Sequence, residues 1–408
     1  MVEALGNLRV IELARVLAGP WAAQTLADLG ADVVKVEHPG RGDDTRAWGP
    51  PYLTPPGEAT GSGESAYYLC TNRNKRSIAI DFAKREGSDL VRDLVRTADI
   101  VIENFRPGAL ARYGLDYESL VRDNPRLIYC SITAFGQSGP YNQRPGYDFA
   151  IQAIGGLMSL TGVADGEPGS GPMKVGVAVT DLSAGLYSTI GILAAVNARH
   201  LTGRGQHLDL SLFDTQIAML ANQASNYLVS GEPPRRMGNS HPNVVPYQAF
   251  ATADGHIILA VGSDEQFRRL CDELARPELA EDTRFATNRG RVENRQALVP
   301  ELAQALGQRG TAAWLVSFEA VGIPCAPINR IDQVFAEPQA EARQIRIELD
   351  HPYGVVPTVA SPVRLSDTPP RYRRAPPLLG EHTDEILRDE LKLSAARIGE
   401  LRAAQVVR

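Results

Sequence analysis

The first 133 residues alternate between short apolar strands and helices, and this alternation limits the possible folds more than any other feature of the chain. The predicted strands and helices are, in chain order, 8–13, 20–29, 31–37, 77–82, 84–97, 99–103 and 126–133. A strand, a helix and a second strand of these lengths pair in parallel through a right-handed crossover. The pattern therefore predicts an α/β fold with a buried, largely parallel sheet.

Ligands of such sheets bind beyond the carboxyl ends of the strands. The segments found there are 15–19, 104–108 and 134–139. Residues 15–20 connect a strand to a helix N-terminus, where backbone N–H groups can hold a phosphate. They lack a GxGxxG pattern, so a plain tight turn is an equally good interpretation.

The second half of the chain predicts a long helix and then a smaller domain. A helix is expected over 147–161, with Asp148 as an ordinary residue of its first turn, and another over 181–199, with Asp181 at its N-cap. A strand at 207–212 and a helix at 214–228 follow. A hairpin at 247–261 and helices at 265–275, 291–306 and 312–320 indicate a smaller α+β domain. The expected domains are 1–225 for the first part of the large domain, 226–330 for the small domain and 331–408 for the return to the large domain.

Composition excludes several classes of function. The 48 acidic residues exceed the 42 basic ones, and the net charge is −6, so no nucleic-acid partner is expected. The longest apolar stretch, 182–200, contains Ser183, Asn197 and Arg199, which favours a core helix over a membrane span. The first ten residues do not resemble a secretory signal, so a cytoplasmic protein without a membrane partner is expected. The four cysteines are far apart and no HExxH occurs, which predicts neither a disulfide framework nor a metal site.

Asp181 is the strongest catalytic candidate among the carboxylates. It follows a run of small residues at 176–180 and opens the long apolar helix. An ordinary N-cap aspartate is the more frequent role for such a residue. The same helix N-terminus would also keep a carboxylate ionised, and an ionised carboxylate can act as a nucleophile in acyl transfer.

Eight ordered segments together resemble the class III CoA-transferase family, the CaiB/BaiF type that includes formyl-CoA transferase. They are 5–20, 29–40, 42–48, 72–80, 103–110, 180–185, 202–206 and 378–383. The resemblance implies a Rossmann-like large domain with a smaller inserted α+β domain, in an interlocked homodimer. It also implies a CoA thioester as substrate, a small carboxylic acid as acceptor and no permanently bound cofactor. The family nucleophile falls on Asp181, and the implied mechanism is ping-pong through an aspartyl-CoA thioester.

The resemblance carries further roles onto individual residues. The implied CoA contacts are Val16, Leu17, Ala18, Asn104, Phe105, Arg106, Arg112, Ala134, Phe135 and Gly136. The implied substrate contacts are Arg15, Arg46, Tyr147, Gly238 and Asn239. Gly238 opens the segment 238–242, which replaces the glycine-rich loop of formyl-CoA transferase. A distal carboxylate on the acceptor would need a cation, and Arg15, Arg46 and Arg144 are candidates that could equally form structural ion pairs.

Departures from family patterns favour one branch. The racemases of the family have a histidine where this chain has Tyr147, which argues against an alpha-methylacyl-CoA racemase. Leu17 and His38 depart from formyl-CoA transferase. Residues 49–51, 63–68, 144–148 and 245–250 are most similar to the members that move CoA from succinyl-CoA to glutarate. Formyl or oxalate, carnitine, malate, itaconate and citramalate transferases stay open, as does a CoA-binding regulatory homologue without catalysis.

Overall fold

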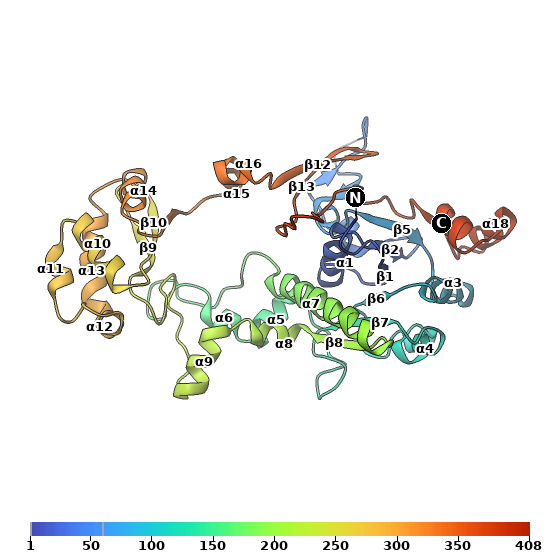
Figure 1. Ribbon diagram of the computed structural model, residues 1–408, viewed down its shortest axis with the longest axis horizontal. Helices are drawn as coiled ribbons and strands as arrows, with labels where there is room; N and C mark the ends of the chain where they lie inside the picture. The colour runs from blue at the N-terminus through green and yellow to red at the C-terminus, as the bar shows by residue number, and fades with distance from the viewer. Residues whose placement is uncertain (1, 59–60) are drawn as a thin grey trace. The chain divides into compact units, whose positions relative to one another are not determined.

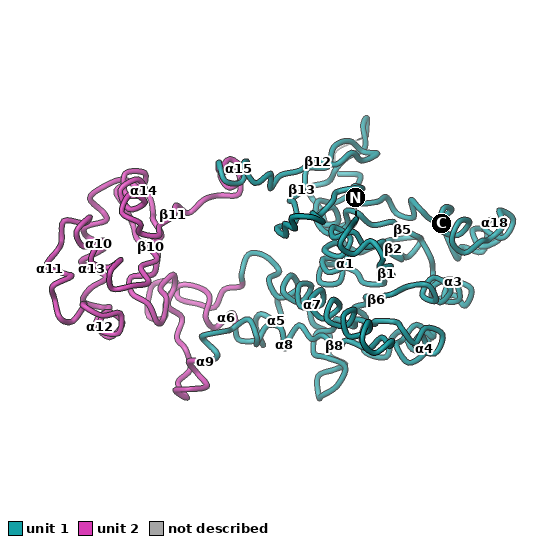
Figure 2. The backbone as a smooth tube through the Cα atoms, in the orientation of Figure 1, with its two compact units in different colours: residues 1–156, 175–224, 338–408 teal, residues 157–174, 225–337 magenta. Residues whose placement is uncertain are grey.

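The structure, a computed structural model, describes residues 2–58 and 61–408. The chain divides into two compact units, coloured separately in Figure 2. Unit 1 contains residues 1–156, 175–224 and 338–408, and unit 2 contains residues 157–174 and 225–337. These bounds differ from the domain boundaries predicted from the sequence, because residues 157–174 and 331–337 cluster with the second unit.

Unit 1 is built around a six-stranded parallel sheet, visible at the centre of that unit in Figure 1. The strands are β1 (Arg9–Glu12), β2 (Asp32–Glu37), β5 (Lys75–Ala79), β6 (Ile100–Glu103), β7 (Ile128–Thr133) and β8 (His207–Ser211). Their order is β5-β2-β1-β6-β7-β8, and Ile11 pairs with Val34 on one side and with Val101 on the other. The predicted α/β fold with a parallel sheet is therefore confirmed.

Helices cover both faces of this sheet. Val10 and Ile11 are adjacent in β1 and point to opposite faces, as residues in a strand must. Val10 belongs to the core under α1 (Ala18–Asp28) and α7 (Val179–Thr202), whereas Ile11 belongs to the core under α3 (Arg85–Val95) and α18 (Ala395–Ala403). The C-terminal residues thus complete one face of a sheet that the N-terminal residues begin.

The remaining elements of unit 1 are short. They are η1 (Asp44–Ala47), β3 (Tyr52–Leu53), β4 (Glu64–Ser65), α2 (Ala66–Leu69), η2 (Ala111–Tyr113), α4 (Tyr117–Asp123), α5 (Asp148–Ile154), α8 (Leu212–Ala218), α16 (Pro338–Ala342), β12 (Arg346–His351), β13 (Gly354–Val359), α17 (Thr383–Glu385) and η3 (Ile386–Glu390). Strands β12 and β13 form an antiparallel hairpin, as do β3 and β4.

Unit 2 has its own hydrophobic core, in which Phe267, Phe318 and Leu302 are fully buried. Its antiparallel sheet has the order β11-β10-β9. Its elements are α6 (Leu157–Leu160), β9 (Tyr247–Ala251), β10 (His256–Ala260), α10 (Asp264–Glu273), α11 (Pro277–Glu281), α12 (Asn288–Glu293), α13 (Arg295–Leu306), α14 (Thr311–Ala320), β11 (Cys325–Pro327) and α15 (Ile331–Ala336); α9 (Ala221–Ser230) crosses the boundary of the units.

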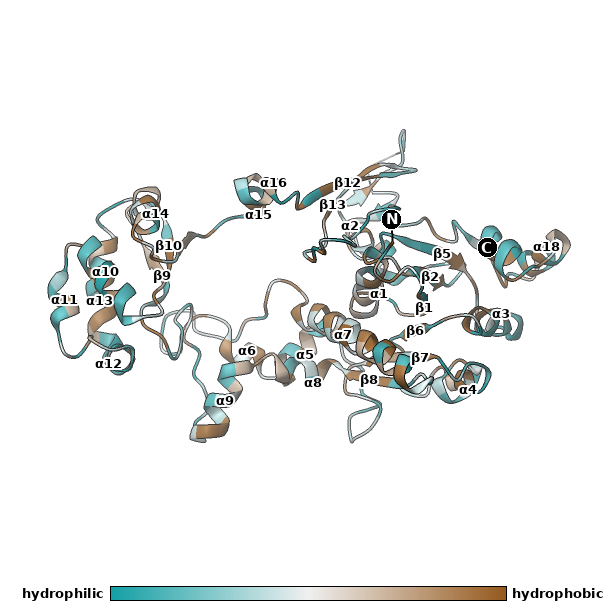
Figure 3. Ribbon diagram, viewed as in Figure 1, coloured by the Kyte–Doolittle hydropathy of each residue, from teal (hydrophilic) through white to brown (hydrophobic). Residues whose placement is uncertain are grey.

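Helix α7 is long and apolar enough to satisfy the length and composition test for a membrane span. Apolar residues recur along it in Figure 3. Half of the most apolar 18-residue stretch of this helix is buried inside the protein. Its residues Ala184, Ile192 and Ala195 lie in the core between α1 and the sheet, as core helices of this kind do.

Several predicted elements differ from the structure. The helices predicted at 214–228 and 291–306 are each divided in two, into α8 and α9 and into α12 and α13. The strand predicted at 77–82 begins two residues earlier, at Lys75, because the two charged residues that open it are buried and paired. The helix predicted at 147–161 is two helices, α5 and α6, separated where Gly156 adopts a φ of +88°. Helix 181–199 begins at Val179 instead of at Asp181.

Candidate active site

The sheet order reverses between β1 and β6, and the turns that follow these two strands therefore diverge. Such a switch point leaves a crevice at the carboxyl ends of the strands. The side chain of Asn104, just after β6, joins the two turns: it accepts a hydrogen bond from the Arg15 N–H at 2.9 Å and donates to the Arg15 carbonyl at 2.6 Å. Glu103 supports the second turn by accepting from the Phe105 N–H at 2.8 Å.

A cavity of about 410 Å³ lies at this switch point. The turn after β1, the turn after β6, the end of β7 and the start of α8 all contribute to its wall. Its lining residues include Arg15, Val16, Leu17, Ala18, Asn104, Phe105, Arg106, Ala134, Arg144, Tyr147 and Asp181. Ten of the predicted site residues thus meet in one pocket, together with Arg144.

Asp181 lies in the first turn of α7, and 9% of the residue is exposed. The sequence prediction that it is the N-cap is wrong, because the N-cap is Ala178, whose side chain cannot accept a hydrogen bond. Among the described residues, no lysine, arginine or histidine forms an ion pair with Asp181. Its carboxylate thus belongs to a residue of the pocket wall that has no cationic partner among the described residues.

Asp148, the first residue of α5, caps the helix that carries Asp181. Its Oδ1 accepts from the Thr180 N–H at 2.8 Å and from the Asp181 N–H at 3.3 Å. The side-chain amide of Gln152 donates to the other oxygen of Asp148 at 2.6 Å, and the side-chain Oε1 of Gln152 accepts from the Val175 N–H at 2.9 Å. A carboxylate from another helix thus replaces the missing N-cap side chain.

This arrangement changes the acidity of Asp181. Burial, and then the negative charge of Asp148, raise the pKa of Asp181 to about 7. An ionised carboxylate that is buried without a cation is poorly stabilised and correspondingly nucleophilic. Tyr67 lies within the field of Asp181, and burial followed by that charge raises the pKa of Tyr67 to about 12, which keeps its hydroxyl protonated at neutral pH.

Three arginines give the pocket a positive wall. Arg15 pairs with Asp44 at 2.9 Å and lies over the ring of Phe105. Arg144 stacks on the rings of Tyr141 and Phe135. Within the described part of the chain, neither Arg106 nor Arg144 forms an ion pair, so both can bind an anionic ligand.

A second cavity, of about 170 Å³, adjoins the first and shares Arg15, Phe105 and Ala109 with it. Arg112, a predicted CoA contact, lines this second cavity, together with His38 and Arg41. The ring of Phe105 therefore lies on the boundary between the two cavities, the second of which is also lined by Glu37, Asp43 and Asp81.

Four predicted site residues of unit 1 do not line the main pocket. Arg112 is in the neighbouring cavity, and Phe135 and Gly136 follow Ala134 after β7 without lining the pocket. The guanidinium of Arg46 is buried against Glu37 and Glu64 at 2.8 and 2.6 Å, which matches the alternative of a structural ion pair. Gly238 and Asn239 belong to unit 2.

The sequence interpretation missed two contributors to the site. Asp148 was interpreted as an ordinary helix start, and its position after Arg144, Pro145 and Gly146 was the available signal. Asp43 lies in the matching segment 42–48, yet its contact with the pocket turn requires the fold. Its carboxylate accepts from the Val16 N–H at 3.2 Å.

Comparison with known proteins assigns the family. Residues 5–383 match the sequence profile of CoA-transferase family III. The chain is 53% identical over 390 residues to a succinate–glutarate CoA-transferase of Agrobacterium fabrum, covering 94% of each chain. It is 42% identical over 407 residues to a human succinyl-CoA:glutarate CoA-transferase, covering 100% of this chain and 90% of that one. A crystal structure of a CaiB/BaiF family protein from Brucella suis superimposes with a TM-score of 0.83 at 49% identity, covering 95% of this chain and 100% of that chain. The chain therefore belongs to CoA-transferase family III.

Proposed function

We propose that this enzyme moves CoA from succinyl-CoA to glutarate or a closely related small dicarboxylate. The observation that carries the proposal is the union, in one pocket, of the isolated carboxylate of Asp181 with the turns after β1 and β6. The relatives from A. fabrum and human, which align over nearly the whole chain, are named for these two acids. A racemase is not favoured, because the residue next to Asp148 is Tyr147 and supplies no second base.

The proposed reaction proceeds by ping-pong through four acyl transfers. The Asp181 carboxylate attacks the succinyl thioester carbon, the C–S bond breaks, and a mixed anhydride and CoA thiolate form. The thiolate then attacks the aspartyl carbonyl, which releases succinate and leaves an aspartyl-CoA thioester. The glutarate carboxylate attacks this thioester and expels the thiolate again. Finally the thiolate attacks the glutaryl carbonyl, which yields glutaryl-CoA and regenerates Asp181.

The two adjoining cavities provide space for CoA. We propose that the thioester end occupies the larger cavity near Asp181 and that the phosphate groups lie near Arg15, Arg106 and Arg112, because guanidinium groups bind phosphates well. Phe105 offers an aromatic face at the boundary of the two cavities. Gly238 and Asn239 stay candidates for contacts to the acyl group.

Arg144 is the proposed partner of the distal carboxylate of the acceptor. We expect Arg144→Gln to lower kcat/KM for glutarate by about 10- to 100-fold, because a charge-assisted hydrogen bond to a carboxylate is lost. The kcat/KM for butyrate, which has no distal carboxylate, should change by less than about twofold by the same argument. The measurement is the rate of acyl-CoA formation with each acid.

The matched control for this experiment is Arg122→Gln, which removes an exposed arginine on α4. It should leave both acceptors unaffected. Equal losses for glutarate and butyrate in Arg144→Gln would contradict the assignment of Arg144. Absence of glutaryl-CoA formation by the unmodified enzyme would contradict the proposed acceptor itself.

We also propose an interlocked homodimer working in the cytoplasm. Apolar side chains on α5 and α7 are exposed in the single chain, with Phe149 at 56%, Leu186 at 49% and Ile190 at 61%. Exposed apolar residues clustered on adjacent helices commonly mark a protein interface. Sedimentation equilibrium should give twice the mass of one chain, and differently tagged chains should exchange only after unfolding. A monomer, or free exchange of native chains, would contradict this proposal.

A further inference from the structure

Val16 has a backbone conformation that its side chain disfavours. Its φ is +72°, in the left-handed region, where a β-branched residue is an uncommon exception. Val16 lies in the turn between β1 and α1 and lines the pocket that contains Asp181. Such a conformation persists only where neighbouring groups hold it, and it occurs preferentially at functional sites.

The carboxylate of Asp43 holds this turn. Both of its oxygens accept from the Val16 N–H, at 3.2 and 3.3 Å. On the opposite side, Asn104 fixes Arg15 through the two hydrogen bonds described above. The N–H and the carbonyl of the Arg15–Val16 peptide group, and the Arg15 N–H before it, are thus held by residues that lie 27 and 89 positions further along the chain.

Asp43 is itself held from two directions. The ammonium group of Lys35 pairs with its carboxylate at 2.9 Å and also donates to the Ala14 carbonyl at 2.9 Å. The Asp43 N–H donates to Glu37 at 3.0 Å. The attraction of Lys35 and the Thr45 N–H outweigh burial and lower the pKa of Asp43 to about 2, so the acceptor stays ionised at every pH at which the enzyme is expected to work.

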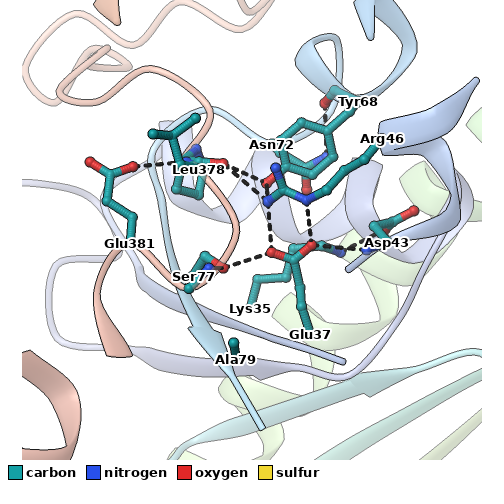
Figure 4. Close-up of polar contacts among 12 residues, drawn as sticks. Lys35, Glu37, Asp43, Arg46, Tyr68, Asn72, Ser77, Ala79, Leu378 and Glu381 are labelled. Atoms are coloured by element: carbon teal, nitrogen blue, oxygen red, sulfur yellow. Dashed lines mark hydrogen bonds and ion pairs between the residues drawn. The ribbon is translucent and has the colours of Figure 1, made fainter. Parts of the chain in front are cut away.

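Glu37 connects this turn to the C-terminal part of the chain, as Figure 4 shows. It accepts from Ser77 Oγ at 2.6 Å and forms two hydrogen bonds with Arg46, at 2.9 and 2.8 Å. Ser77 Oγ in turn accepts from the Gly380 N–H at 2.9 Å, and Arg46 donates to the Pro377 carbonyl at 3.1 Å. The matching segment 378–383 thus has a structural connection to the pocket.

From this continuous chain of contacts we infer that Asp43 and Glu37 are positioning residues for CoA transfer. They act through the Val16 backbone, and the C-terminal segment 377–383 supports them. Neither residue is required to touch the reacting atoms. The inference rests on the proposed function for its kinetic readout, but its binding readout requires only that the pocket take CoA.

The test compares Asp43→Asn with Glu64→Gln. Asparagine preserves the shape of Asp43 but removes the charge that pairs with Lys35. We expect the dissociation constant for CoA, measured by calorimetry, to rise by about 30-fold and kcat/KM for succinyl-CoA to fall by a similar factor. Glu64→Gln breaks a contact with the same Arg46, yet Glu64 touches neither Asp43 nor Val16, so it should lower thermal stability and change neither constant by more than about twofold.

A rescue variant separates positioning from loss of stability. Glycine adopts a positive φ without steric cost, so Val16→Gly removes the need for Asp43 to hold the turn. The double variant Val16→Gly, Asp43→Asn should therefore bind CoA at least about fivefold more tightly than Asp43→Asn alone, a non-additive result. Additive losses, or an Asp43→Asn variant that behaves like Glu64→Gln, would overturn the inference.

Glu37→Gln provides a second route if Asp43→Asn does not fold, because it keeps the shape of the side chain that supports the Asp43 N–H. At the same thermal stability, Glu37→Gln should also weaken CoA binding more than Glu64→Gln does. Equal dissociation constants for CoA in these two variants would overturn the inference. If the unmodified enzyme binds CoA but transfers nothing to glutarate, the proposed acceptor fails while the binding comparison still decides the role of Asp43.

Discussion

Replacing Asp181 with asparagine is expected to lower kcat for CoA transfer by at least about 10⁴-fold, because the amide cannot form the anhydride that begins the proposed reaction. The same substitution should stabilise the folded protein at neutral pH. Asp181 is nearly buried, and no cation pairs with it among the described residues. Its ionisation therefore opposes folding, as expected for a reactive group in an active site.

The pKa of Asp181 determines in which direction the stability advantage of Asp181→Asn changes with pH. The pKa of Asp181 rises from 3.8 to about 7 in the folded protein, chiefly through burial. Between these values the unfolded chain has released the proton that the folded chain keeps, so rising pH favours unfolding. The stability advantage of Asp181→Asn should thus grow from about pH 4 to about pH 7 and stay constant above that. Thermal unfolding of both proteins across this range is the measurement.

The variant Asp148→Asn tests whether the charge of Asp148 contributes to the raised pKa of Asp181. The charge of Asp148 is the second contribution to the raised pKa of Asp181, and asparagine can still accept from the Thr180 N–H. Because only the ionised form of Asp181 can attack in the proposed reaction, kcat/KM of the unmodified enzyme should rise with pH through about 7. In Asp148→Asn the rising part of the pH profile of kcat/KM should move to lower pH, by up to about one unit. A rise of kcat/KM at the same pH as in the unmodified enzyme, or at a higher pH, would contradict the role given to Asp148.

Chemical trapping identifies the nucleophile independently. Incubation with succinyl-CoA followed by hydroxylamine should modify residue 181, and mass spectrometry can map the site. Asp165→Asn is a suitable control, since that partly exposed carboxylate pairs with Arg236 in unit 2. Modification at another residue, or an active Asp181→Asn enzyme, would refute the mechanism.

Glu12→Gln is expected to destabilise the folded protein by about 3–5 kcal/mol, because it leaves buried ammonium groups without a full counter-charge. Glu12, Lys35 and Lys75 are fully buried, and the two lysines pair with separate oxygens of Glu12 at 3.1 and 2.8 Å. Burial already outweighs the attraction of Glu12 for Lys75 and lowers the pKa of Lys75 to about 8. Urea unfolding measures the change in free energy.

The matched control for this prediction is Glu293→Gln on α12, which breaks an exposed ion pair with Arg289. Exposed pairs contribute little, so this variant should unfold like the unmodified protein. A loss of less than about 1 kcal/mol in the free energy of unfolding of Glu12→Gln would contradict the prediction. It would mean that the buried lysines release their protons or rearrange at almost no cost in free energy.

Much of unit 1 can be predicted from local sequence. Five of the six strands of the sheet and the helices α1, α3 and α7 follow from apolar periodicity, from Pro20 near a helix start and from Gly30 after a helix end. The strand at Lys75 is harder to predict, because charged residues are seldom fully buried. Its start depends on Glu12, whose carboxylate comes from a strand 63 residues earlier.

The candidate site likewise contains residues that the sequence can predict and residues whose role depends on the tertiary structure. The turns at Arg15 and Asn104 follow from the rule that ligands bind beyond strand ends, and the family resemblance points to Asp181. Arg46 was a candidate for substrate binding, and its ion pairs with Glu37 and Glu64 depend on tertiary contacts that no local pattern encodes. The cap supplied by Asp148 is of the same kind.

The sequence by itself determined the order of strands and helices, and hence the parallel sheet and the turns that could bind a ligand, because hydrophobic periodicity and turn residues act over a few positions. Only the tertiary structure decided the state of the reactive groups. The acidity of Asp181 depends on its burial and on Asp148, 33 residues away, and the conformation of Val16 depends on Asp43. Electrostatic and hydrogen-bond energies depend on distance in space, so they become defined once the strands have paired.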